Sequence, residues 1–210
     1  MNEQAQHWDA AYRRGSDQIS WYQDEARVSL ELIDRLGVAP DAPIIDIGGG
    51  ASPLAANLLD RGHRDLTVLD ISQQALDTAR ERLGARADKV TWIRADLRNW
   101  RPTRAYQLWH DRAVLHFLTD TQDQRTYADL SARALVPGGH VIIATFAPDG
   151  PERCSGLPVV RYAPAELADL LGPSFDVVED RRETHQTPGG TAQSFTWLVA
   201  RYVSAEHRGE

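Results

Sequence analysis

The sequence of 210 residues contains a single cysteine, Cys154, and no long run of apolar residues. One cysteine cannot form an internal disulfide bond. A membrane-spanning helix needs about 18 or more consecutive apolar residues, and an export signal needs a cationic segment followed by an apolar one. Because neither pattern occurs, we expect a cytoplasmic protein without a membrane partner.

Basic clusters and metal-ligand spacings are also missing. The chain carries 23 Lys and Arg against 30 Asp and Glu, a net charge of −7, and its arginines are scattered. Nucleic acid is therefore not an expected partner. Neither HExxH nor CxxC occurs and the seven histidines are dispersed, so we expect no metal site.

The chain shows no repeat and no linker, and its 42% apolar and 25% charged residues are ordinary for a folded globular protein. At this length we expect one domain over residues 1–210. Aromatic residues on probable helices before the first strand indicate an N-terminal helical cap over residues 1–42. The core then spans 43–146, and 147–210 holds a loop and two terminal strands.

Short β-branched or aromatic runs alternate with helix-length amphipathic segments, which predicts an α/β fold with a doubly wound, mostly parallel sheet. The gap between the last two runs is polar and contains Pro-Gly-Gly, too little for a helical crossover, so these two strands are expected to pair antiparallel. The expected helices are Pro53–Arg61, Gln73–Leu83 and Arg125–Leu135. The expected seven strands are Ile44–Ile47, Leu66–Leu69, Val90–Arg94, Tyr106–Trp109, His140–Phe146, Phe175–Val178 and Phe195–Tyr202.

Three glycines, Gly48, Gly49 and Gly50, follow the first expected strand, and Ser52 and Pro53 then suit the start of a helix. Glycines allow a tight turn and a close approach of a ligand to the backbone. Asp70 ends the second expected strand, where a carboxylate can bind a ribose diol. The two features together favour a nucleoside-type cofactor over a plain turn.

The same stretch argues against a dinucleotide. The dinucleotide fingerprint places a glycine or alanine where this chain has Pro53, and Asp46 would repel a pyrophosphate. S-adenosylmethionine (SAM) carries an ammonium and a sulfonium, which an acidic group attracts. The residues therefore favour SAM over NAD.

Four segments together resemble the class I SAM-dependent methyltransferases. "IIDIGGGAS" resembles the first motif of that family, "LDIS" and "RADLRNW" resemble its next two, and "LVPGGHVIIATF" resembles its fifth strand. The resemblance spans about residues 44–146, and the expected reversed last strand extends it. It implies a Rossmann-like fold with SAM as cofactor and S-adenosylhomocysteine (SAH) as its product.

The resemblance also implies cofactor-binding roles for individual residues of this chain. Asp111 is expected either to contact the cofactor or to pair with Arg112, and Asp96 is alternatively a helix cap or a solvated acid. Trp21 and Tyr22 either close over the sulfonium or pack in the core. The implied cofactor-binding residues are Trp21, Tyr22, Asp46, Gly48, Gly49, Gly50, Asp70, Ile71, Asp96, Leu97 and Asp111.

Catalysis of methyl transfer from an activated donor depends mainly on alignment, so no diagnostic triad is expected. His116 and Asp111 are the candidate catalytic residues, because they follow the fourth expected strand, although a lone histidine between apolar neighbours is often structural. His110 is interpreted as a packing residue. The candidate acceptor-binding residues are Tyr22, His116, Arg153, Cys154, Arg161 and His185, of which those after the fifth strand alternatively form an ordinary loop.

We therefore expect a methyltransferase that acts on N, O or S of a small molecule, as a monomer or homodimer. "HWDAAYRRG" followed by "SWYQ" is similar to a segment of some protein-lysine methyltransferases, which keeps a protein acceptor as the alternative. An NAD(P)-dependent oxidoreductase and a SAM-binding protein without catalysis are further alternatives.

Overall fold

The computed structural model describes residues 3–13 and 23–203 of the chain. Its helices are α1 Glu3–Tyr12, α2 Arg27–Leu36, α3 Leu54–Asp60, α4 Gln73–Leu83, α5 Thr121–Ala134 and α6 Pro164–Leu171, with 3₁₀ turns η2 Gly84–Lys89 and η3 Leu115–Phe117. Its strands are β1 Ile44–Ile47, β2 Leu66–Asp70, β3 Val90–Arg94, β4 Tyr106–Arg112, β5 Leu135–Phe146, β6 Arg153–Cys154, β7 Leu157–Pro158, β8 Phe175–Gln186 and β9 Ala192–Tyr202.

The main sheet has seven strands in the order β3-β2-β1-β4-β5-β9-β8. Strands β1 to β5 run parallel, whereas β9 is antiparallel to both β5 and β8. The predicted doubly wound, mostly parallel sheet with a reversed last strand is confirmed. The reversed strand lies between β5 and β8, so the edge of the sheet is β8 rather than the last strand of the chain.

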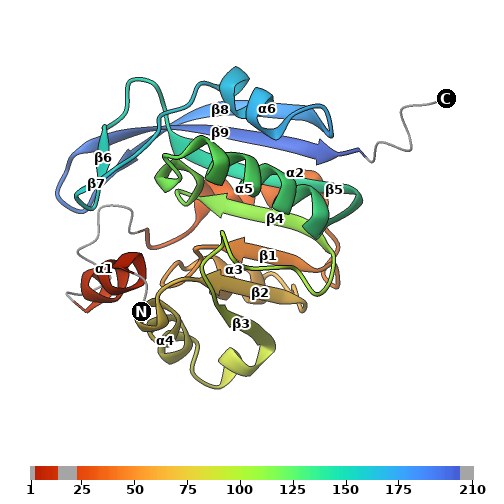
Figure 1. The fold of residues 1–210 in the computed structure, drawn as a ribbon. Helices are drawn as coiled ribbons and strands as arrows, with labels where there is room; N and C mark the ends of the chain where they lie inside the picture. Colours follow the sequence, from red (N-terminus) through yellow and green to blue (C-terminus); the bar gives the residue numbers. More distant parts are fainter. Residues whose placement is uncertain (1–2, 14–22, 204–210) are drawn as a thin grey trace.

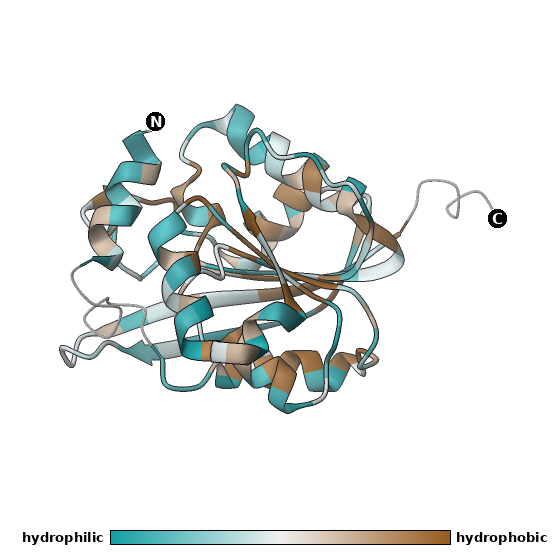
Figure 2. Cartoon of the chain, turned by 90° about the horizontal axis from the view of Figure 1, so that it is seen from below, coloured by the Kyte–Doolittle hydropathy of each residue, from teal (hydrophilic) through white to brown (hydrophobic). Residues whose placement is uncertain are grey.

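Helices cover both faces of this sheet (Figure 1). Residues of α2, α3 and α4 pack with Ile44, Leu108 and Phe195 on one face, and residues of α5 and α6 pack with Ile45, Trp109 and Leu198 on the other. Side chains alternate between the faces along each strand, so each of these strands contributes to two apolar clusters. Figure 2 shows the apolar strands between helices whose outer surfaces are hydrophilic.

Three features differ from the sequence expectation. Strands β8 and β9 have 12 and 11 residues and form a long hairpin, because the charged residues after Val178 continue the strand at the edge of the sheet. Helix α6 was not predicted. The loop after β5, expected to lack regular structure, contains the short β6–β7 hairpin.

The parallel strands place their carboxyl ends at one edge of the sheet, where the glycine turn follows β1. Ligands bind at this edge in doubly wound folds. Among the described residues, no helix is both long and apolar enough to cross a membrane.

Candidate functional site

A cavity of about 240 Å³ lies at the carboxyl edge of the sheet, bounded by the turns after β1 to β4, by α1 and α2, and by the β6–β7 hairpin. Part of the predicted site lines it: Asp46, Gly48, Gly49, Asp70, Ile71, Asp96, Leu97 and Cys154. The structure thus brings most of the predicted cofactor-binding residues together. Trp21 and Tyr22 lie outside the described residues.

The glycine turn passes directly over two carboxylates. A Cβ on Gly49 would lie 2.2 Å from Oδ2 of Asp46, and a Cβ on Gly50 would lie 2.5 Å from Oδ2 of Asp70. Gly48 has a φ of +64°, a conformation that favours glycine. A Cβ on Gly48 would also lie 2.1 Å from Cγ2 of Val114, so the turn needs glycine for space at all three positions and for backbone conformation at Gly48.

Asp46 is 4% exposed and is held by a buried histidine. Its Oδ1 lies 2.7 Å from Nδ1 of His110, and Nε2 of His110 lies 2.9 Å from Oγ of Ser29 in α2. Asp46 and His110 face each other because they are register partners on adjacent strands. The buried Oδ2 of Asp46 has no hydrogen-bond partner among the described residues, although it borders the cavity.

Asp70 lies at the opposite side of the glycine turn, and its Oδ1 accepts a hydrogen bond from the Ser72 backbone N–H at 2.8 Å. Burial raises the pKa of Asp70 to about 7, against the opposing effect of hydrogen bonds from the Ser72 and Gly50 backbone. A carboxyl group with this pKa changes its charge near neutral pH. A ligand that donates hydrogen bonds to it would favour the charged form.

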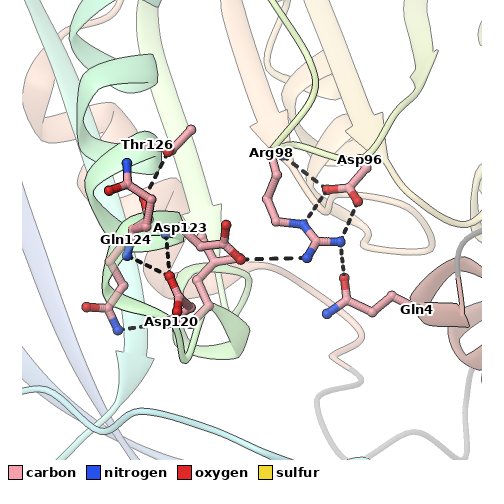
Figure 3. Close-up of polar contacts among 9 residues, drawn as sticks. Gln4, Asp96, Arg98, Asp120, Asp123, Gln124 and Thr126 are labelled. Carbon is pink, nitrogen blue, oxygen red and sulfur yellow. Dashed lines mark hydrogen bonds and ion pairs between the residues drawn. The ribbon is translucent and has the colours of Figure 1, made fainter.

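Asp96 is tied to Arg98 at the rim of the cavity (Figure 3). Nε and Nη2 of Arg98 donate to the two carboxylate oxygens at 2.9 and 2.6 Å, and the Arg98 backbone N–H also donates to Oδ1. Nη2 of Arg98 reaches Gln4 Oε1 at 2.9 Å, and Nη1 lies 3.6 Å from Asp123. Asp96 is therefore not a solvated acid: its carboxylate pairs with Arg98 and caps the turn that follows it, and Arg98 connects α1 with the cavity rim.

Helix α1 lies against the cavity through two further contacts. Oδ1 of Asp9 accepts hydrogen bonds from Ser72 Oγ at 2.6 Å and from the Gln74 backbone at 3.2 Å, at the start of α4. Trp8 lines the cavity and packs edge-to-face on Phe117, with ring centroids 5.0 Å apart. Within the described part of the chain, Trp8 and Tyr12 are the aromatic side chains that α1 brings to the cavity.

Asp111 is fully buried and is not among the cavity-lining residues. Its Oδ1 accepts from the Val114 backbone at 2.8 Å, and its Oδ2 accepts from the Leu115 backbone at 3.0 Å and from the Tyr127 hydroxyl at 2.8 Å. Burial raises the pKa of Asp111 to about 6 although these bonds oppose the rise. Both oxygens hold the turn after β4, an arrangement that differs from the cofactor contact and from the Arg112 pair expected for Asp111.

His116 is likewise fully buried and outside the cavity lining. Its ring contacts Phe117 and Phe146 at centroid distances of 4.4 and 4.8 Å, and its Nδ1 accepts from the Phe146 backbone at 3.4 Å. Burial, with a smaller effect of Arg112, lowers the pKa of His116 to about 3. The ring is therefore neutral near pH 7 and only weakly basic, unlike the titrating histidine that was expected.

The residues expected to bind the acceptor do not all line the cavity. Cys154 is buried and lines the cavity, whereas Arg153, Arg161 and His185 are not among its lining residues. Arg153 donates to the Gly156 carbonyl, and Arg161 binds the Gly150 carbonyl and Glu152, each at 3.2 Å. His185 lies in β8 with its ring beside that of Phe195.

Sequence reasoning missed several polar residues of the cavity, among them Ser29, Arg98, His110 and Arg112. Leu108, His110 and Arg112 share one face of β4, and Trp109 and Asp111 share the other. Asp46 borders the cavity, and its register partner on β4 is His110. The alternation along β4 therefore turns His110 and Arg112 toward the cavity and Asp111 away from it.

The geometry agrees with comparisons to known proteins. Residues 44–139 match the family model described as a methyltransferase domain. This core region is similar to a methyltransferase domain, and the fold of the chain is the Rossmann-like methyltransferase fold. A solved member of this fold is 1,6-didemethyltoxoflavin-N1-methyltransferase from Burkholderia thailandensis, with bound 1,6-didemethyltoxoflavin and SAH. It aligns with a TM-score of 0.74 at 23% identity and covers 96% of this chain and 89% of its own.

Two curated methyltransferases are similar in sequence. Trans-aconitate 2-methyltransferase from Azoarcus sp. (strain BH72) is 29% identical over 126 residues, which is 60% of this chain and 47% of that protein. The eEF1A lysine and N-terminal methyltransferase of Mus musculus is 27% identical over 154 residues, 68% of this chain and 21% of that protein. The chain spans half or less of the length of the first curated relatives that it matches.

Proposed function

We propose that this protein transfers the methyl group of SAM to an N, O or S atom of a small-molecule acceptor. The observation that carries the proposal is the pair of buried carboxylates, Asp46 and Asp70, beneath one glycine turn at one cavity. A buried carboxylate oxygen without a partner is costly unless a ligand donor or a cation meets it. Oδ2 of Asp46 meets that description.

The residues present fit SAM. Asp46 would bind the ammonium of its methionine part, beside the backbone of Gly48 and Gly49, and Asp70 would accept hydrogen bonds from the ribose hydroxyls. Next to them, Ile71, Leu97 and the Asp96 carboxylate line the part of the cavity suited to the adenine. His110 is a positioning residue for Asp46, because its Nδ1 contact fixes the carboxylate.

SAM supplies an electrophilic methyl group, so the protein's contribution is chiefly to hold donor and acceptor in line. Asp111 and His116 are proposed to support the turn after β4, since both are buried outside the cavity. Neither is then needed as a general base. An acceptor that reacts as a thiolate or a neutral amine fits such a site, because it need not lose a proton before attack.

A compact acceptor is favoured because α1, α2 and the β6–β7 hairpin all border the cavity. The relative that acts on trans-aconitate supports a small molecule, and the eEF1A methyltransferase supports a protein lysine. We favour the small molecule, since the aligned share of the eEF1A enzyme is 21% of its length. One domain over residues 1–210, a cytoplasmic location and a monomer or homodimer also stay predictions.

The experiment has two parts. Calorimetry with SAH tests the cofactor: we expect binding by the wild type and strongly weakened binding by Asp70→Ala. No heat with either SAM or SAH on folded protein would contradict the proposal. Transfer of label from methyl-labelled SAM is then measured separately into small-molecule extracts and into protein. Label that appears in protein alone would replace the small-molecule acceptor by a lysine.

A further inference from the structure

The two buried carboxylates of the cavity are held in different ways. His110 fixes Asp46 from the neighbouring strand, whereas Asp70 depends on the turn that leads into α4. In that turn, the Ser72 backbone N–H donates a hydrogen bond to Oδ1 of Asp70 at 2.8 Å. The proposed ribose contact needs a carboxylate in a fixed orientation. A group that fixes Ser72 therefore bears on the cofactor site.

Ser72 is completely buried, and its hydroxyl is both a donor and an acceptor. Its Oγ accepts a hydrogen bond from the Ala75 backbone N–H at 3.1 Å, which caps α4. The same hydroxyl donates to Oδ1 of Asp9 in α1 at 2.6 Å, across a sequence separation of 63 residues. Ser72 is therefore held between α4 and α1, and it connects Asp9 with Asp70.

The start of α4 also holds Asp9 directly. The Gln74 backbone N–H donates to the same Oδ1 at 3.2 Å, and a carboxylate at the first turn of a helix is stabilised by the unpaired N–H groups and by the helix dipole. Figure 1 shows α1 beside α4. Trp8, the residue before Asp9, lines the cavity, so the helix that carries Asp9 also bounds the cavity.

The carboxylate of Asp9 acts on Asp70 by its charge as well. Burial is the main cause of the raised pKa of Asp70, and backbone hydrogen bonds oppose the rise. The negative charges of Asp46 in β1 and Asp9 in α1 raise this pKa further, because a like charge favours the neutral form of an acid. Asp9 therefore contributes two separable effects: a hydrogen bond that fixes Ser72, and a charge that moves the titration of Asp70.

We propose that Asp9 is a positioning residue of the cofactor site, which fixes the Asp70 carboxylate for the ribose hydroxyls through Ser72. This inference rests on the proposed function and adds α1 to the elements that hold SAM. Asp9 is not among the cavity-lining residues, so it acts on the cofactor through Ser72 and Asp70. Docking of α1 on α4 and binding of SAM then favour each other, since linkage between two equilibria is reciprocal.

SAH calorimetry at pH 8 tests the hydrogen bond. Asp9→Ala should weaken SAH binding by about 10-fold, the scale of one hydrogen bond to a charged group. Asp9→Asn should bind nearly as the wild type, because its amide oxygen can accept from Ser72 and Gln74. In a double-mutant cycle, Asp9→Ala should have a much smaller effect in a Ser72→Ala background than in the wild type. Glu3→Ala is the matched control, because Glu3 is the other acid of α1 and is exposed.

The pH dependence of SAH binding tests the charge. Without the charge of Asp9, Asp70 loses its proton at lower pH, so SAH affinity should begin to fall at a lower pH in Asp9→Asn than in the wild type. Glu3→Gln removes the same charge at an exposed position and should leave that pH unchanged.

Three results would overturn the inference and leave the proposed function standing: wild-type SAH affinity in Asp9→Ala, an undiminished effect of Asp9→Ala in the Ser72→Ala background, or a wild-type pH dependence in Asp9→Asn. A wild-type protein that binds neither SAM nor SAH would overturn both.

Discussion

The imidazole of His110 and the carboxylate of Asp46 form a buried pair, with Nδ1 and Oδ1 2.7 Å apart. The pair exists because two parallel strands set the residues opposite each other and turn both side chains to the same face. The other ring nitrogen contacts Ser29, so α2 is linked to the end of β1 through a single side chain. The second carboxylate oxygen remains for a ligand.

Replacing His110 by Phe should therefore destabilise the fold. The ring volume is kept, but Asp46 loses its hydrogen bond inside the protein, and a buried polar group without a partner costs about 1–3 kcal/mol. Urea unfolding measures the free-energy change. Ser29→Ala is the comparison, because it removes the hydroxyl and leaves the Asp46 contact in place, so its effect should be smaller. Equal stability of His110→Phe and wild type would show that the pair contributes nothing.

The second prediction concerns pH and Asp70. Its pKa is about 7 in the folded protein and 3.8 as the unperturbed value, so the folded state keeps a proton that the unfolded chain releases between these values. The unfolded state thus binds fewer protons in this window, and the contribution of Asp70 to stability falls as pH rises from about 4 to 7. Asp70→Asn should remove this slope and be more stable than wild type above pH 7 without ligand.

The same variant should bind SAH more weakly at pH 8, since the amide cannot replace the carboxylate at the ribose. In the wild type, SAH affinity should fall as pH drops below 7, because protonation removes the charged form that the hydroxyls favour. Urea midpoints at pH 5 and pH 8, with calorimetry at both, measure the two effects. An Asp70→Asn protein with the same pH slope as wild type would assign the slope to another group.

Much of the fold could be predicted because short β-branched runs alternate with amphipathic segments. β1 and β3 begin and end where the sequence placed them, and β2 differs by one residue. The extent of β8 could not be predicted, since Glu179 to Gln186 are mostly polar and charged, a composition that an edge strand tolerates and that also suits a loop. Helix α6 has only eight residues, too few for a clear periodic pattern.

The residues proposed to hold the cofactor could be brought to one cavity from the sequence because they lie in the turns at strand ends. The cavity-lining residues of β4 could not, because they depend on which face of the strand each side chain occupies. Leu108 and Trp109 point to opposite faces of β4 and both are buried. The apolar pattern of this strand therefore does not indicate which side chains share the face of Asp46. An error of one residue exchanges the two faces, and Asp111 was expected where His110 and Arg112 lie.

The third prediction tests the close approach of the glycine turn. Gly49→Ala would place a Cβ 2.2 Å from Asp46 Oδ2, so the turn or the carboxylate must move. We expect a loss of about 1–3 kcal/mol in stability, as for other overpacked buried sites, and a marked loss of SAH affinity. Gly189→Ala is the matched control, because its Cβ would meet only Thr187 Oγ1, at 3.8 Å. Full SAH affinity in Gly49→Ala would refute the close-packed turn.

The last prediction separates support from catalysis at His116. Its buried ring, with a pKa of about 3, packs between Phe117 and Phe146, so His116→Ala should leave a cavity and cost about 2 kcal/mol or more of stability. The pH dependence of turnover between pH 6 and 8 should be the same in the variant and the wild type, because the ring stays neutral throughout that range. Urea unfolding and pH profiles, corrected for the folded fraction, measure both quantities. If turnover of the wild type instead changes with a pKa near 6.5 and this change is absent in His116→Ala, His116 is the general base. Loss of a side chain that only packs would not abolish such a pH dependence.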